Sequence, residues 1–358
     1  MTAGPTPAPV PPVAAAPTEL WSPGAASGVG SLPGDDPLEA ARLVFGELPD
    51  LPHLPELPAR GAGAGISGRG ATFLTDLPVD LQPAGWRLVN RPGRDLRRAR
   101  DLLARDLDAL EEVADGYVGP LKLAVAGPWT LAASVELPRG HKVLSDAGAV
   151  RDLTEALGEG IALHVAEISR RIPGARPLVQ LDEPALPAVL LGHIPTPSGF
   201  SVLAAVEEGT AADGIAQVIA ASTRPVAGRV GVGAAVGVHC CAARPPLSVL
   251  RRAGAAFFSL DGLALGQADD DGIGEAVEAG IRLLIGVVPG TDAELSVPGR
   301  TVEPLRSLWR RLGFTAESVG KVVAVTPACG LAGASERYAR SALRAVREAG
   351  RALVEAPE

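Results

Sequence analysis

Three short segments of the sequence each carry a possible ligand for a soft metal ion. They are Val238-His239-Cys240-Cys241, Phe258-Ser259-Leu260-Asp261 and Thr326-Pro327-Ala328-Cys329-Gly330, and together they hold all three cysteines of the 358-residue chain. Each segment lies at the end of a predicted strand. An imidazole, two thiolates and a carboxylate form a suitable tetrahedral ligand set for zinc. A zinc ion in such a place can hold a substrate thiol as its thiolate and so prepare it for alkylation.

The period of an extended strand selects among these groups. Side chains at positions i and i+2 point to the same side, so His239 and Cys241 are expected to face one site and Cys240 to pack on the other side. Taken singly, each group also has an ordinary structural explanation: a hydrogen-bonded core histidine, a small buried Cys329, or a loop hydrogen bond at Asp261. Taken together, we predict zinc ligation by His239, Cys241, Asp261 and Cys329. The ligands spread over about 90 residues, which is typical of a catalytic site rather than of a zinc finger.

The elements that must position these groups alternate between short apolar runs and amphipathic segments. Strands are predicted near 28–32, 121–126, 178–181, 233–238, 256–260, 283–287 and 321–325, with one more hidden between Pro52 and Asn90. Helices are predicted at 36–47, 95–115, 146–171, 210–222, 246–253, 272–279, 302–312 and 335–354. This alternation favours an α/β fold, a single eightfold (β/α)8 TIM barrel, with an open doubly wound sheet as the alternative. In a barrel, groups at the C-terminal strand ends converge on one mouth.

Composition sets the limits of the domain. Residues 1–26 are rich in Pro and Ala and predict a flexible, disordered tail, which leaves 27–358 as the barrel domain. The Gly-rich segment Gly61–Gly70 is interpreted as a mobile loop.

A net charge of −8 gives no reason to expect nucleic acid as a partner. The sequence shows neither a signal peptide nor an apolar run that could span a membrane, and three cysteines fit a reducing, cytoplasmic location.

Five motifs, in this order along the chain, resemble those of the cobalamin-independent methionine synthase family, specifically its C-terminal catalytic barrel. That barrel shares its fold with uroporphyrinogen decarboxylase. The resemblance runs from Val29 to about Ala334. The motifs are Val29-Gly30-Ser31-Leu32-Pro33, Gly127-Pro128-Trp129-Thr130, Gln180-Leu181-Asp182-Glu183-Pro184-Ala185-Leu186, His239-Cys240-Cys241 and Cys329-Gly330-Leu331.

The resemblance implies methyl transfer to the thiol of homocysteine, which gives methionine. Zn²⁺ would be held by His239, Cys241, Cys329 and an acid, for which the family uses a glutamate and this chain offers Asp261. The methyl donor implied is methyltetrahydrofolate, or methylcobalamin carried by a corrinoid protein.

For the amino-acid end of the substrate, the resemblance implies two contacts. Asp182 corresponds to the carboxylate that receives the amino group, and Ser31 to the serine near the carboxylate. Two family residues have no match: the loop Gly286–Asp292 contains no histidine to act as an acid, and Gly61–Thr75 contains no glutamate to partner the amine. The general acid is therefore not assigned.

Two alternatives stay open beside this interpretation. One is a corrinoid-linked or other thiol alkyltransferase with a different acceptor. The other is a zinc-binding or thiol-binding protein without turnover. A decarboxylase of the uroporphyrinogen type is disfavoured because it needs no soft-metal ligands.

Overall fold

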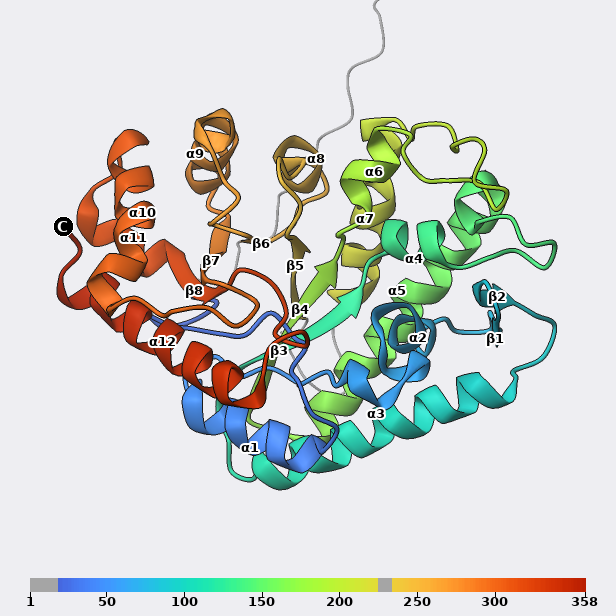
Figure 1. The fold of residues 1–358 in the computed structure, drawn as a ribbon, viewed down its shortest axis with the longest axis horizontal. Helices are drawn as coiled ribbons and strands as arrows, with labels where there is room; N and C mark the ends of the chain where they lie inside the picture. Colours follow the sequence, from blue (N-terminus) through green and yellow to red (C-terminus); the bar gives the residue numbers. More distant parts are fainter. Residues whose placement is uncertain (1–18, 225–233) are drawn as a thin grey trace, which may run out of the picture.

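The computed structural model describes residues 19–224 and 234–358, and its centre is a curled parallel sheet of six strands (Figure 1). The strands neighbour one another in chain order. They are β3 (Gly119–Ala126), β4 (Ala175–Asp182), β5 (Ala235–Cys240), β6 (Phe257–Leu260), β7 (Arg282–Val288) and β8 (Val323–Pro327). All six were predicted from the sequence, although residue 233, the expected start of β5, lies outside the described residues. The α/β class is confirmed, and the sheet has the shape of a half-barrel.

The predicted strand at 28–32 and the one hidden after Pro52 are present only as isolated parallel bridges. Ala26 bridges Val325 on β8, His53 bridges Lys122 on β3, and a third bridge joins Ser31 to Glu56. Segments 25–27 and 52–56 therefore contact the two edges of the sheet. Proline explains why no continuous ladder forms around His53, because residues 52, 55 and 58 lack an N–H to donate.

The chain is already packed at residues 19–26. Leu20, Trp21, Ala25 and Ala26 are buried, and the Trp21 ring meets Phe257 edge-on with centroids 5.8 Å apart. The prediction of a flexible tail up to residue 26 is thus wrong for its last eight residues. Residues 1–18 lie outside the described part of the chain.

The helices surround the outer face of the sheet (Figure 1). Those of more than one turn are α1 (Pro37–Glu47), α2 (Ile66–Ala71), α3 (Arg94–Val113), α4 (Pro128–Ser134), α5 (Ala147–Arg171), α6 (Leu186–Leu190), α7 (Glu208–Ser222), α8 (Leu247–Arg252), α9 (Asp270–Glu278), α10 (Pro298–Arg311), α11 (Ala316–Val322) and α12 (Glu336–Glu355). Side-chain caps explain why several starts were predictable. Asp36 accepts hydrogen bonds from the amides of Leu38 and Glu39, and Ser335 Oγ accepts one from the Tyr338 amide.

The region between Pro58 and Asn90 holds features that the sequence did not reveal. Strands β1 (Val79–Gln82) and β2 (Gly85–Leu88) pair as an antiparallel hairpin apart from the main sheet. The Gly-rich segment is ordered, with a short 3-10 turn at Ala62–Ala64 followed by α2. The interpretation of Gly61–Gly70 as a mobile loop is therefore wrong. A Cβ on Gly70 would lie 2.8 Å from Ala126 Cβ, so glycine lets α2 approach the end of β3 closely.

The inner face of the sheet is layered along the strands. At the N-terminal end an apolar cluster fills the interior, formed by Leu20, Trp21, Ala25, Leu51, Leu178, Phe257, Leu284 and Ala324. Above it on alternating positions come buried polar residues, including Lys122, Gln180 and Ser259. Lys122 Nζ donates to the Val29 carbonyl at 2.6 Å and to Gln180 Oε1 at 2.8 Å. The next residues on these strands reach the C-terminal end, where the site lies. Within the described residues, no helix is long and apolar enough to cross a membrane.

Candidate metal centre and substrate site

Three of the four predicted metal ligands meet at the C-terminal end of the sheet. One ligand atom each of His239, Cys241 and Cys329 lies within 4.8 Å of the other two. His239 comes from the end of β5, Cys241 directly follows that strand, and Cys329 follows β8 by two residues. Strands β5 and β8 are separated by β6 and β7, and the curl of the sheet brings their C-terminal ends close together. The predicted alternation is also present, since Cys240 is fully buried whereas Cys241 is half-buried.

The imidazole of His239 is oriented for metal binding. Its Nδ1 lies 3.1 Å from the Ser259 carbonyl oxygen and 3.0 Å from Ser259 Oγ, on the neighbouring strand β6. A carbonyl can only accept, so Nδ1 carries the hydrogen and Nε2 keeps its lone pair. Among the described residues Nε2 is buried and has no hydrogen-bond partner. A buried, unpaired imidazole nitrogen held by a backbone carbonyl on its other side is the arrangement of metal-bound histidine.

The two thiols form a close pair, with Sγ atoms 3.3 Å apart. The neighbouring thiol of Cys241, followed by the His239 imidazole, lowers the pKa of Cys329 to about 4, whereas the pKa of Cys241 is raised by Cys329 and by burial. Two sulfurs on a tetrahedral zinc at about 2.3 Å lie about 3.8 Å apart. The pair must widen by only about half an ångström to fit zinc, so the three groups suit that ion.

Asp261 is not part of this cluster as the structure describes it. It follows β6 and is half-buried, and its Oδ1 accepts a hydrogen bond from the Leu263 amide at 2.9 Å. Burial raises its pKa, and the charges of Cys329 and His239 also act on it. Asp261 therefore lies at the same end of the sheet as the three clustered residues, but zinc ligation by Asp261 stays a prediction.

Asp182 lies beside the cluster of His239, Cys241 and Cys329, the candidate metal cluster. It ends β4 directly opposite His239 of β5, is 7% exposed, and accepts a hydrogen bond from Gln180 Nε2 at 2.8 Å. Its pKa is raised, because burial outweighs the charges of His239 and Lys122 and the Gln180 hydrogen bond. Within the described residues this buried carboxylate has one hydrogen bond, and its position opposite His239 suits it to receive a cationic group.

The next residue, Glu183, has a structural function. Its carboxylate accepts hydrogen bonds from the Trp129 amide at 2.9 Å, the Thr130 amide at 2.8 Å and Thr130 Oγ1 at 2.7 Å. These donors belong to the first turn of α4, whose amides have no partner within the helix. Burial raises the pKa of Glu183 to about 7. The Gly-Pro-Trp-Thr and Asp-Glu-Pro motifs are thus one connected unit.

Ser31 lies against the loop that carries Cys329. Its carbonyl accepts a hydrogen bond from the Leu331 amide at 2.8 Å, and a Cβ on Gly330 would collide with its Oγ. Gly330 therefore leaves room for the serine hydroxyl beside the metal cluster. The structure brings both predicted substrate residues, Ser31 and Asp182, to the end of the sheet that holds the cysteines.

The sequence analysis missed Glu56. It pairs with Ser31 through a backbone bridge, its side chain is 15% exposed, and its Oε1 lies 3.1 Å from Nε of Arg69. Burial raises its pKa to about 7; Arg69 opposes this shift and the charge of Asp182 adds to it. Glu56 lies a few residues before Gly61–Thr75, the segment in which the resemblance leads us to expect an acid. The available signal was a lone acid inside the apolar, proline-rich segment Leu51–Leu57.

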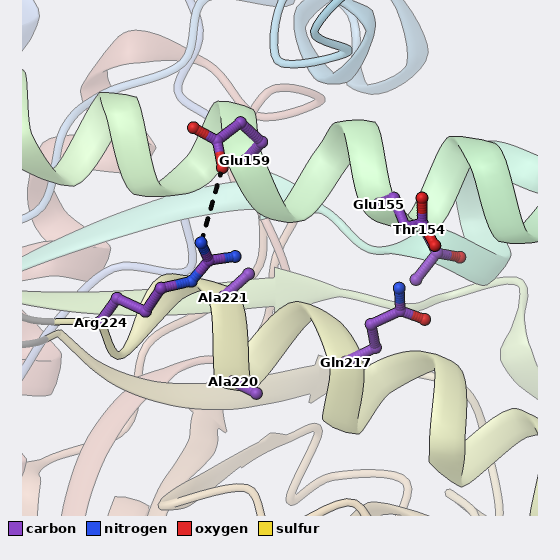
Figure 2. A pocket seen from close by; sticks show the side chains of 7 residues that line it. All are labelled: Thr154, Glu155, Glu159, Gln217, Ala220, Ala221 and Arg224. Atoms are coloured by element: carbon purple, nitrogen blue, oxygen red, sulfur yellow. Dashed lines mark ion pairs between the residues drawn. The ribbon is translucent and has the colours of Figure 1, made fainter.

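The groove on the helical surface has fewer reactive side chains than the strand-end cluster. A groove of about 480 Å³ lies between α5 and α7 (Figure 2). Its polar lining includes Glu159 and Arg224, whose charged atoms are 3.9 Å apart and largely exposed. Such a pair contributes at most about 1 kcal/mol. The strand-end cluster, rather than this groove, is the candidate site.

The fold is that of a known enzyme. A B12-independent methionine synthase from Shewanella sp. W3-18-1, solved in complex with selenomethionine, superposes with a TM-score of 0.59 over 93% of this chain and 98% of that one, at 14% identity. At that identity the likeness establishes a shared fold. No protein-family model and no curated protein sequence matches the chain.

Proposed function

We propose that the protein is a zinc-dependent methyltransferase that moves a methyl group to the thiol of homocysteine and so forms methionine. The observation that carries this proposal is the meeting of one ring nitrogen of His239 with the sulfurs of Cys241 and Cys329 at the C-terminal end of the sheet. The fold shared with a B12-independent methionine synthase supports the reaction class.

The three clustered residues would hold the zinc, with Asp261 as the proposed fourth ligand. A free thiol has a pKa of about 8.5, so only a few per cent is ionised at neutral pH. A bound zinc ion would supply the positive charge that keeps the substrate sulfur deprotonated. Ser259 fixes the His239 ring, and the curled sheet fixes the separation of the two cysteine segments.

We propose that Asp182 and Glu56 receive the substrate's ammonium group and that Ser31 lies at its carboxylate. Asp182 is buried and the Glu56 side chain is 15% exposed, and the charge of Asp182 raises the pKa of Glu56. An ammonium group between them relieves this repulsion. The zinc cluster next to them then orients the thiol of the same molecule, and such positioning supplies much of the rate of methyl transfer.

The loop after β7 bears on the methyl donor. Residues 286–292 read Gly-Val-Val-Pro-Gly-Thr-Asp and contain no histidine. The acid in this loop, Asp292, accepts hydrogen bonds from the amide and hydroxyl of Ser335, which lower its pKa, and is thus a poor proton donor at neutral pH. Methyltetrahydrofolate needs its leaving amine protonated. The sequence of this loop therefore favours a methylated corrinoid.

We further propose that segments 25–27 and 52–56 complete an eight-stranded barrel and that the domain comprises 27–358 together with the packed residues 19–26. Their bridges to β8 and β3, and the bridge between Ser31 and Glu56, support this closure. A zinc site built on thiolates needs reduced cysteines, which favours a cytoplasmic location.

The direct test is an activity assay with both donors. Purified zinc-loaded protein, homocysteine, and either methylcobalamin or methyltetrahydrofolate are incubated, and methionine is quantified by mass spectrometry. We expect methionine with methylcobalamin. Tight zinc binding without methionine from either donor would contradict the proposal and favour a zinc-binding protein without turnover. Turnover of other thiols but not of homocysteine would assign a different acceptor.

A further inference from the structure

Four buried charged side chains form a continuous chain behind the proposed ammonium site. Glu56 pairs with Arg69, which in turn pairs with Asp106, and Asp106 also pairs with Arg60. The distances are 3.1 Å from Glu56 Oε1 to Arg69 Nε, 2.5 Å from Arg69 Nη1 to Asp106 Oδ2, and 2.7 Å from Asp106 Oδ1 to Arg60 Nη1. We call these four residues the buried charge chain.

The buried charge chain links the site to the helices outside it. Asp106 lies in the second half of α3, Arg69 lies on α2, and Arg60 ends the short 3-10 turn Pro58–Arg60. The side chains of Arg69 and Asp106 are only 4% and 2% exposed. Arg69 can reach this position because Gly68 and Gly70, its neighbours on both sides, pack without side chains against Trp86 and Ala126.

Arg69 is held from two sides. Its Nη1 donates a hydrogen bond to Asp106 Oδ2, and its Nε forms an ion pair with Glu56 Oε1 that lacks hydrogen-bond geometry, so one guanidinium group lies between two carboxylates. Glu56 is consequently oriented as well: its Oε1 faces Arg69, and its Oε2 lies beside Gly30, next to Ser31. The nearby charges of Asp182 and Lys122 act on the same carboxylate.

Arg69 also affects the charge of Glu56. Burial disfavours the ionised carboxylate, and Arg69 is the largest influence in the opposite direction. Loss of that cation would raise the pKa of Glu56 further and weaken its attraction for an ammonium group. Breaking a buried ion pair by removing one partner leaves the other without compensation.

We infer that Arg69 is a positioning residue for recognition of the substrate's amino group: held by Asp106, which Arg60 also contacts, it orients the Glu56 carboxylate without touching the substrate itself. The inference rests on the proposed function, because it assigns the ammonium contact to Glu56 and Asp182. It predicts that Arg69 affects the part of the affinity that depends on the amino group and leaves the zinc–thiol part unchanged.

The experiment compares two thiols that differ only in the amino group. Homocysteine and its desamino analogue 4-mercaptobutyrate are titrated calorimetrically into zinc-loaded protein, and the ratio of their dissociation constants measures recognition of the ammonium group. For the wild type we expect homocysteine to bind at least about tenfold more tightly, which corresponds to one charged hydrogen bond. In Arg69→Gln the ratio should fall to near unity, with the dissociation constant of 4-mercaptobutyrate within about twofold of wild type.

Two further variants complete the design. Arg69→Lys keeps the cation but cannot bridge both carboxylates, so the ratio should fall severalfold even if Arg69→Gln does not fold. Arg42→Gln removes an exposed ion pair with Glu39 and should leave both constants unchanged. An unchanged ratio in Arg69→Lys, or equal weakening of both ligands in either Arg69 variant, would overturn the inference while leaving the proposed function intact. A wild type that binds both thiols equally would refute the proposed amino-acid substrate and the inference together.

Discussion

The most decisive perturbation is the same substitution at each of the three cysteines. Cys241→Ala and Cys329→Ala remove sulfurs that lie 3.3 Å apart and within 4.8 Å of a histidine nitrogen. Cys240→Ala removes a buried sulfur on the other side of the strand, although Cys240 lies between His239 and Cys241 in the sequence. We expect one zinc per chain in the wild type, and its loss in the first two variants only.

The size of the effect follows from the number of ligands. Zinc bound by four protein groups at neutral pH gains about 10–16 kcal/mol, or about 2.5–4 kcal/mol for each ligand. Loss of one thiolate should therefore raise the dissociation constant by roughly 10²–10³. Cys240→Ala leaves all the predicted ligands in place, and its zinc affinity should equal that of the wild type.

The assay is a competition titration with a chromophoric zinc chelator of known affinity, together with elemental analysis after dialysis. Circular dichroism checks that each variant is folded before its affinity is interpreted. The reasoning fails if Cys329→Ala binds zinc as tightly as the wild type, because Cys329 would then not be a ligand of the zinc ion that His239 and Cys241 bind. Weakened binding in Cys240→Ala alone would mean that the opposite side of β5 faces the metal.

Three further perturbations test other parts of the site. Gly330→Ala places a methyl group on Ser31 Oγ and should weaken homocysteine binding by about tenfold, whereas Gly333→Ala, whose Cβ meets only a methyl group at 3.9 Å, should bind normally in the same titration. Asp182→Asn should weaken homocysteine binding more than zinc binding; equal losses would remove Asp182 from the amino-acid site. Because burial raises the pKa of Glu183 to about 7, the folded metal-free protein retains a proton that the unfolded chain releases above about pH 4.3, and the stability this proton contributes is lost as the pH rises towards 7. Urea unfolding between pH 4.5 and 8 should show a decline on the order of 3 kcal/mol from this group, and Glu183→Gln should remove that share while the share of Glu56 stays; an unchanged slope in that variant would assign the decline to other groups.

The sequence predicted the parts of the fold that rest on local patterns. The six strands of the sheet are apolar runs bounded by turn residues, and α1 and α12 begin at capping side chains, Asp36 and Ser335. The period of two along β5 correctly separated Cys241 from Cys240. Short helices such as α4 and α6 were missed because five to seven residues show too little periodicity to be recognised.

The remainder depends on pairings between distant segments, which a single sequence does not display. Glu56 enters the site because Ser31 pairs with it, and the packing of Trp21 depends on Phe257. The glycines of Gly61–Gly70 suggested flexibility, but they serve close packing of α2, which a local pattern cannot distinguish from a loop. The place of Asp261 likewise depends on a turn whose geometry the residue type does not determine.

The bridge between Ala26 and Val325 has a consequence for the synthesis of the protein. Its partners are about 300 residues apart, so this contact can form only after nearly the whole chain has left the ribosome. The metal cluster depends on the same late event, because Cys329 and the glycine against Ser31 follow β8. Nascent chains that stop before residue 323 should therefore expose the inner face of an incomplete sheet and would need protection from aggregation until translation ends.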